Sequence, residues 1–175
     1  MKFVLLFFCC SLYLSGYSQS LSEADLVSRN KAEMVLGDSL IMNTVKGHDH
    51  IVFSVADKYF IVLLKKQGSF MEYHIQLDNE RIKVLTDTVV QLSGELGNRI
   101  FDKTMYKKEF ITFDSDFYKS GYEISSGNIT YFVFKDKEGE RFGESRLSML
   151  IKPNPIDSAI YSYFVKRIMH YSKSM

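Results

Sequence analysis

Residues 51–90 read IVFSVADKYFIVLLKKQGSFMEYHIQLDNERIKVLTDTVV, and this stretch decides the fold class. Apolar residues with high β propensity cluster in four runs, at 51–55, 59–64, 70–77 and 82–85. Short segments that favour turns separate the runs: Ala56-Asp57, Gln67-Gly68-Ser69 and Asp78-Asn79-Glu80. Because strands joined by such short turns pair antiparallel, the stretch predicts an antiparallel meander of three or four strands.

The third run, FMEYHIQL (residues 70–77), shows the alternation of a half-buried strand. Successive side chains of a strand point to opposite faces of the sheet. Polar and apolar residues nearly alternate here, so we expect one face in the core and the other in water. The apolar set is Phe70, Tyr73, Ile75 and Leu77, and the polar set is Glu72, His74 and Gln76.

A helix is expected on the N-terminal side of the meander, over residues 20–36. Apolar residues recur there at roughly helical spacing, and Ser20 and Glu23 have the spacing of a capping box. Gly37 is a suitable C-terminal stop, and a second short helical segment can follow at residues 38–45.

The segment after the meander is the least regular part of the chain. It holds at most a short helix near residues 95–103, which Gly94 and Gly97 weaken. Residues 129–135 and 140–151 then have the composition of two further strands, joined by a polar turn.

A C-terminal helix is expected after Pro153. Asn154 as N-cap, Pro155 at the first helical position and Asp157 in the first turn each favour a helix start. An apolar stripe marks its core-facing side: Ile156, Ile160, Tyr163, Phe164 and Ile168. The sequence therefore predicts a single α+β domain over residues 19–175. Its antiparallel sheet has five or six strands, with the N-terminal and C-terminal helices packed on one face.

Residues 1–18, MKFVLLFFCCSLYLSGYS, have the order of a secretory signal peptide. Lys2 gives a positive start, residues 3–14 are almost wholly apolar, and the small residues Gly16 and Ser18 follow. The apolar run is shorter than the about 20 residues that a membrane-spanning helix needs. We expect the signal to be cleaved, which leaves a secreted or periplasmic domain without a transmembrane span.

Cys9 and Cys10 are the two cysteines of the chain. Lipid anchoring at either is not expected, because Phe7 and Phe8 stand where a lipid-attachment motif has small residues. The mature domain is then free of cysteine, which excludes disulfides, thiol nucleophiles and cysteine metal sites from it.

The charges of the chain are balanced, with 22 Lys and Arg against 21 Asp and Glu. Nucleic-acid-binding proteins need a basic surface that displaces counterions from phosphates, so no nucleic-acid partner is expected. The chain also lacks a G-x-G-x-x-G or Walker loop, and we expect no cofactor.

The stretch GHDH (residues 47–50) is the most suggestive of a metal site. His48 and His50 can supply two imidazole ligands, and a third would come from His74, Asp57, Glu72 or His170. The alternative, which we favour, is a solvated polar turn before the first strand. We therefore predict no metal site, and His48 and His50 are the candidates if one exists.

Asp114 and Asp116 have the D-x-D order that calcium loops use. Tyr118 occupies the next ligand position, however, and the glycine that such a loop needs is not at position 119. We expect a surface loop there.

Tyr122 and Tyr131 are the candidates for an interaction surface. Exposed tyrosines can stack against sugars or anchor a partner protein. The alternative, which we favour, is packing in the core with some hydroxyls reaching solvent. Tyr131 should face away from Phe132 on its strand, so one of the two is a candidate for the outer surface.

Export, neutrality and the lack of a catalytic motif favour a non-catalytic binding or interaction module of the periplasm or cell envelope. Its partner would be a protein, a glycan or another envelope component. The alternative is an exported hydrolase with an unrecognised site, in which His48, His50 or His74 acts beside a carboxylate. A third class, an inhibitor or immunity-type partner of an envelope enzyme, would show an exposed apolar patch on one sheet face.

Overall fold

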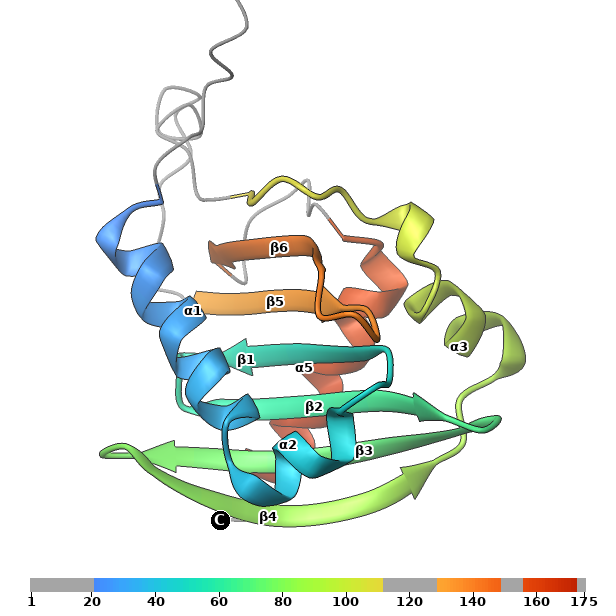
Figure 1. Cartoon of the computed structure of the whole chain (residues 1–175), viewed down its shortest axis with the longest axis horizontal. Coiled ribbons are helices and arrows are strands. Elements are labelled where there is room, and N and C mark those ends of the chain that lie inside the picture. The colour runs from blue at the N-terminus through green and yellow to red at the C-terminus, as the bar shows by residue number, and fades with distance from the viewer. Residues whose placement is uncertain (1–20, 112–128, 149–155, 173–175) are drawn as a thin grey trace, which may run out of the picture.

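The computed structural model describes residues 21–111, 129–148 and 156–172. In these ranges the chain forms one antiparallel sheet of six strands, four α-helices and one short 3-10 helix (Figure 1). The strand order is β4-β3-β2-β1-β5-β6. The predicted α+β class and the six-stranded sheet are confirmed. The strands are β1 His50–Val55, β2 Tyr59–Lys66, β3 Ser69–Asp78, β4 Arg81–Val90, β5 Ile129–Lys135 and β6 Arg141–Ser148.

The meander predicted from residues 51–90 is present as β1 to β4, each strand paired with the next. Gln67 and Gly68 both have positive φ angles in the turn between β2 and β3, as do Asn79 and Glu80 between β3 and β4. Two-residue turns of this kind match the twist of a hairpin. β4 extends to Val90 because its polar second half still pairs with β3.

The two N-terminal helices lie close to their predicted positions. α1 spans Glu23–Leu36 and α2 spans Ser39–Val45. The capping box of α1 is formed by Ser22 and Asp25, so the predicted pairing of Ser20 with Glu23 is wrong by two residues. The correct pair keeps the same three-residue spacing.

Helix α3 (Gly94–Ile100) and the 3-10 helix (Lys103–Met105) follow β4, and α5 (Ser158–Ser172) ends the described chain. Asp157 caps α5, because its side chain accepts hydrogen bonds from the backbone N–H groups of Ala159 and Ile160. The predicted cap residues 154 and 155 lie outside the described residues, as does the predicted signal at 1–18. No helix in the described ranges is both long enough and apolar enough to cross a membrane.

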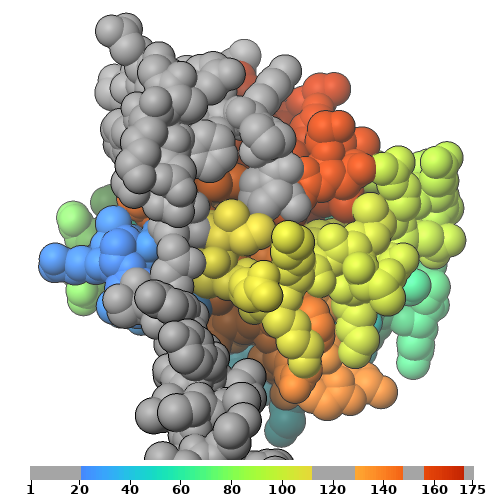
Figure 2. Space-filling model, turned by 90° about the horizontal axis from the view of Figure 1, so that it is seen from above, coloured from blue at the N-terminus to red at the C-terminus, as the bar shows by residue number. Residues whose placement is uncertain are grey.

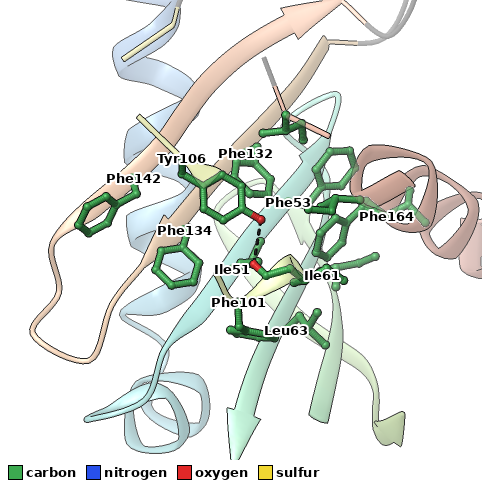
Figure 3. Packing of buried hydrophobic residues seen from close by; sticks show 14 of the residues in the cluster. Ile51, Phe53, Ile61, Leu63, Phe101, Tyr106, Phe132, Phe134, Phe142 and Phe164 are labelled. Carbon is green, nitrogen blue, oxygen red and sulfur yellow. Dashed lines mark hydrogen bonds between the residues drawn. The ribbon is translucent and has the colours of Figure 1, made fainter. Parts of the chain in front are cut away.

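The N-terminal and C-terminal helices lie on opposite faces of the sheet, whereas the sequence predicted them on one face. α1 and α2 cover the face that contains Val52 and Val62, and α5 covers the face that contains Phe53 and Ile61 (Figures 1 and 3). The physical reason is that β1, β2 and β5 are apolar on both sides. Each side therefore needs its own cover to exclude water.

The two edges of the sheet differ. The edge of β6 is covered by the chain around residues 107–111, where Ile111 donates to the Glu144 carbonyl at 2.8 Å and Arg146 donates to the Ile111 carbonyl at 3.1 Å. Figure 2 looks onto this end of the sheet, with the covering segment in yellow. No strand of the described ranges pairs with the outer edge of β4. We call it the free edge.

Candidate functional site

A polar cluster lies between β3 and α5, at the β4 end of the sheet. Glu72 and His74 are two residues apart on β3 and so share a face, and Arg167 and Tyr171 are four apart on α5 and so share a side of the helix. The sequence predicted that Glu72 and His74 face water. That prediction is wrong, because α5 covers this face and buries both side chains.

Arg167 holds the carboxylate of Glu72. Its Nε and Nη2 atoms donate to Glu72 Oε2 at 2.9 and 2.5 Å. Glu72 is 0% exposed and the Arg167 side chain is 28% exposed. Burial alone would raise the pKa of Glu72, but the interactions with His74 and Arg167 outweigh it and hold that pKa below its ordinary value. Glu72 is therefore a buried, ionised group.

The imidazole of His74 is enclosed between Glu72 and Tyr171. His74 Nε2 lies 3.4 Å from Glu72 Oε1, and its ring centroid lies 3.6 Å from that of Tyr171. Nε2 makes no hydrogen bond of good geometry within the described chain. His74 is 2% exposed, so bulk solvent does not reach it.

Tyr163 completes the cluster from α5. Burial raises the pKa of its hydroxyl, and the charge of Glu72 raises it further. The hydroxyl is buried and has no hydrogen-bond partner in the part of the chain that the structure describes. A buried hydroxyl without a hydrogen-bond partner is unusual in a folded protein.

An open groove of about 360 Å³ lies above this cluster. Residues 88–92, at the end of β4 and just beyond it, form one wall, and Tyr163, Arg167 and Tyr171 form the other. The guanidinium uses Nε and Nη2 for Glu72, and Nη1 makes no hydrogen bond to any described residue. The groove is therefore lined by two tyrosines and by an arginine whose Nη1 has no hydrogen-bond partner among the described residues.

The geometry suits binding better than catalysis. A general base must be within hydrogen-bond reach of a substrate proton. Glu72 and His74 are the acid–base groups of the cluster, and both are buried beneath the groove. Arg167 also binds Glu72 through two nitrogens, which stabilises the carboxylate in its charged form.

His48 and His50, the candidate metal ligands, lie elsewhere. His48 Nδ1 lies 3.0 Å from the Lys46 carbonyl, and His50 Nδ1 lies 2.8 Å from the His48 carbonyl. His50 is 6% exposed, so the predicted solvated turn does not extend to it. It shares a face of β1 with Val52, on the α1 side of the sheet, whereas His74 faces α5. The sheet separates the two imidazoles.

The described ranges contain no group of three or more His, Cys, Asp or Glu residues placed to hold a metal ion. Asp57 accepts a hydrogen bond from Ser28 at 2.9 Å, and His170 is an exposed residue of α5. Neither provides a third ligand for the histidines of GHDH. Asp114 and Asp116 lie outside the described residues.

Tyr131 is not a surface residue. It is 0% exposed, and its hydroxyl donates to Glu144 at 2.7 Å. Arg29 holds the same carboxylate through Nε at 2.7 Å and Nη2 at 2.6 Å. Phe132 is buried as well, since both faces of β5 are covered. Tyr131 is therefore not the interaction surface for which it was a candidate and packs in the core, as the favoured alternative expects. Tyr122 lies outside the described residues.

The groove was not predicted from the sequence. Tyr163 belongs to the predicted apolar stripe of the C-terminal helix, and no acid was predicted to pair with Arg167. A signal was available, because Arg167 lies between Phe164 and Ile168, which both face the core. A cation so close to a buried stripe needs a partner, and Glu72 in an otherwise β-forming run is a matching acid.

Comparisons with protein-family models, curated proteins and solved structures found no match for this chain.

Proposed function

We propose that this chain is an exported, non-catalytic binding module of the periplasm or cell envelope, and that the groove between β4 and α5 is its binding site. One observation carries the proposal. The acid–base pair of Glu72 and His74 is buried, while the aromatic and polar groups above it line an open groove. Export is supported by the signal-like order of residues 1–18.

The groove has the properties of a site for a small part of a larger ligand. Its volume of about 360 Å³ is near the lower end of the range for ligand sites. Tyrosine rings supply rigid contact area, and guanidinium N–H groups supply directional polar contacts. This combination suits a protein segment or a glycan, the partner classes expected from the sequence.

An exported hydrolase is the second candidate, and the 3.4 Å contact between His74 and Glu72 favours it. A catalytic carboxylic acid usually has a raised pKa, so that it can donate a proton near neutral pH. The pKa of Glu72 is instead lowered. Turnover at this site would also require α5 to move away from β3.

The test is to fill the groove without touching the core. Gln91 is exposed and lines the groove, so Gln91→Trp should block it, and Asn43→Trp on the exposed side of α2 is the matched control. The ligands are immobilised oligosaccharides and synthetic peptides that represent the cell envelope. We expect binding of at least one ligand, a loss of about tenfold or more in Gln91→Trp, and less than twofold change in Asn43→Trp.

Two results would contradict the proposal. One is that no ligand of the panel distinguishes Gln91→Trp from the unmodified protein. The other is turnover of chromogenic esters, glycosides or peptides by the purified protein that His74→Gln abolishes. That second result would establish the hydrolase.

A further inference from the structure

The groove lies beside the free edge of β4, and this position indicates what binds in it. β4 is ten residues long, and no described strand pairs with its outer side. Every second residue of an edge strand presents an unpaired backbone N–H and C=O. The opposite edge, on β6, has its backbone groups bonded to residues 107 and 111. The edge of β6 is therefore covered by another part of the chain, whereas no described strand covers the edge of β4.

The second half of β4 is the part that can accept another strand. The register of β3 and β4 shifts between His74 and Ile75, which leaves Leu85 outside the regular ladder. A bulge of this kind bends the strand and interrupts regular pairing. The segment 86–90 beyond the bulge is regular, and it ends at the groove.

Side chains of an added strand would alternate between the two faces of the sheet. Thr88 and Val90 mark the groove side of β4, since Thr88 pairs with Glu72 and Val90 packs against the cluster under α5. Every second side chain of an added strand would therefore lie over the groove and reach toward Arg167.

The charges on that side favour an acidic side chain. Lys83 pairs with Gln76, which shares a face of β3 with His74. Arg81 lies two residues before Lys83 on the same side and pairs with Asp78, so Lys83 is the cation of β4 without an acid directly opposite it. Lys83 is exposed. Asp87, the acid of β4, pairs with Tyr73 on the opposite face. Arg167 adds the N–H groups of Nη1 within the groove.

We infer that the ligand is an extended polypeptide segment that pairs with residues 86–90 as an added strand and points an acidic side chain at Arg167. The inference rests on the proposed function and names the ligand class of the same groove. In this mode of recognition, main-chain hydrogen bonds supply affinity and alternate side chains supply specificity. The carboxylate accepts from Nη1 of Arg167, which Glu72 holds in place.

The experiment uses the purified protein and a labelled heptapeptide, acetyl-TVTETVT-amide, in which valine, glutamate and valine face one side. Two further versions carry N-methyl groups at odd or at even positions, so that each blocks one edge of the peptide. We expect one methylated version to bind at least about tenfold more weakly and the other to stay within about threefold of the parent. Equal binding of both versions would overturn strand addition.

The charge is tested on the peptide and on the protein. Replacing the central glutamate of the peptide by glutamine should weaken binding about tenfold, and replacing it by lysine should weaken binding further. Gln91→Glu places an acid in the groove and should weaken binding of the parent peptide. Gln67 is exposed at the turn between β2 and β3, and Gln67→Glu should leave that binding unchanged. Binding that is unchanged by these substitutions would contradict an acidic ligand.

The failure of this inference can be told apart from failure of the proposed function. An oligosaccharide that binds the protein and is lost in Gln91→Trp, with no binding of any heptapeptide, would overturn the inference and leave the proposed function standing. A concentration-dependent dimer that Gln91→Trp disrupts would also overturn the inference, because the ligand of the groove would then be a second copy of the chain. If neither peptide nor oligosaccharide binds, both proposals fail.

Discussion

The two ends of the sheet contain the same chemical pair in different surroundings. Near the β6 end, on the α1 side, Arg29 holds the carboxylate of Glu144. Near the β4 end, on the α5 side, Arg167 holds that of Glu72. The carboxylates are 3% and 0% exposed, and the arginine side chains are 24% and 28% exposed. The sequence separations, 115 and 95 residues, show that each pair ties a helix to a distant strand.

The surroundings of the two pairs decide what each can do. Glu144 also accepts from Tyr131, the guanidinium of Arg29 lies over the ring of Phe110, and residues 107–111 cover the edge beyond. Beside Glu72, the edge is free and Arg167 lines an open groove. The same kind of ion pair therefore lies under a covered edge at one end of the sheet and beside an open groove at the other.

Of the substitutions considered for the two ends of the sheet, Arg29→Ala should lower the free energy of unfolding most. It leaves the carboxylate of Glu144 buried and without its cation, which typically costs about 3–5 kcal/mol of unfolding free energy. Urea unfolding followed by circular dichroism measures the loss. Lys31→Ala, a neighbouring residue of α1, should change stability by less than about 0.5 kcal/mol. If Arg29→Ala lowered the free energy of unfolding by as little as Lys31→Ala, the pair of Arg29 and Glu144 would not stabilise this end of the sheet.

Arg167→Ala should cost less, about 2–3 kcal/mol, because water in the groove can reach Glu72 once the guanidinium is gone. The same unfolding experiment gives the ranking of the two arginines. The exposed neighbour Lys166 provides the control variant, Lys166→Ala. If Arg167→Ala proved more destabilising than Arg29→Ala, the groove end would be the more closed of the two.

Gly143→Ala tests the packing of Tyr106 and the segment that follows it against β6. Gly143 has a φ angle of 61°, and an added Cβ would lie 2.8 Å from Cδ1 of Tyr106. Tyr106 packs on Phe132 and donates to the Ile100 carbonyl (Figure 3), so it has little room to move. We expect a loss of about 1–3 kcal/mol. Gly94→Ala, with open space around the added Cβ, should be neutral or slightly stabilising.

The smallest effect is expected from His50, which is buried on the α1 side of the sheet. Burial lowers its pKa and the charge of Lys135 lowers it further, and these outweigh the hydrogen bond to the His48 carbonyl and the charges of Glu33 and Asp49, which raise it. Below about pH 6.5 the unfolded chain binds a proton that the folded chain does not, so stability should fall as the pH falls from 6.5. Unfolding experiments between pH 7 and pH 5 measure the slope.

His50→Asn should flatten that slope, because asparagine does not titrate. The control is Asn43→Ala, at an exposed residue of α2 that does not titrate, and its slope should match that of the unmodified protein. An unmodified protein whose slope equals that of His50→Asn would contradict a lowered pKa for His50.

The strands of the meander could be predicted because their information is local. Each run of β-forming residues is bounded by turn residues, and pairing of neighbours follows from the short turns. The placement of the helices could not be predicted in the same way. A stripe of apolar residues on a helix shows that it packs, but not against which face of the sheet.

The candidate site was missed for a related reason. Alternation in β3 correctly separated Glu72 and His74 from Tyr73 and Ile75, but it placed the polar pair in water. Their burial depends on α5, which begins more than 80 residues later in the chain. Only the packed structure brings Arg167 to the carboxylate and removes the cost of burying it.

Gly97 shows how a residue-level rule can mislead. Glycine weakens an isolated helix, so Gly97 counted against the helix predicted near residues 95–103. In the structure, an added Cβ at Gly97 would lie 2.5 Å from Cζ of Phe70. The glycine therefore permits close contact between α3 and the ring of Phe70, and this packing supports the helix.

The seam between β1 and β5 has a consequence for synthesis. Val55 pairs with Thr130, so 75 residues must follow before the outer side of β1 finds its partner. At about 5–20 residues per second, a ribosome needs roughly 4–15 s to make that length. During that interval β1, which lies in the middle of the finished sheet, is an apolar edge strand whose outer backbone groups are unpaired. A nascent chain that a chaperone does not shield would be most prone to aggregate through β1.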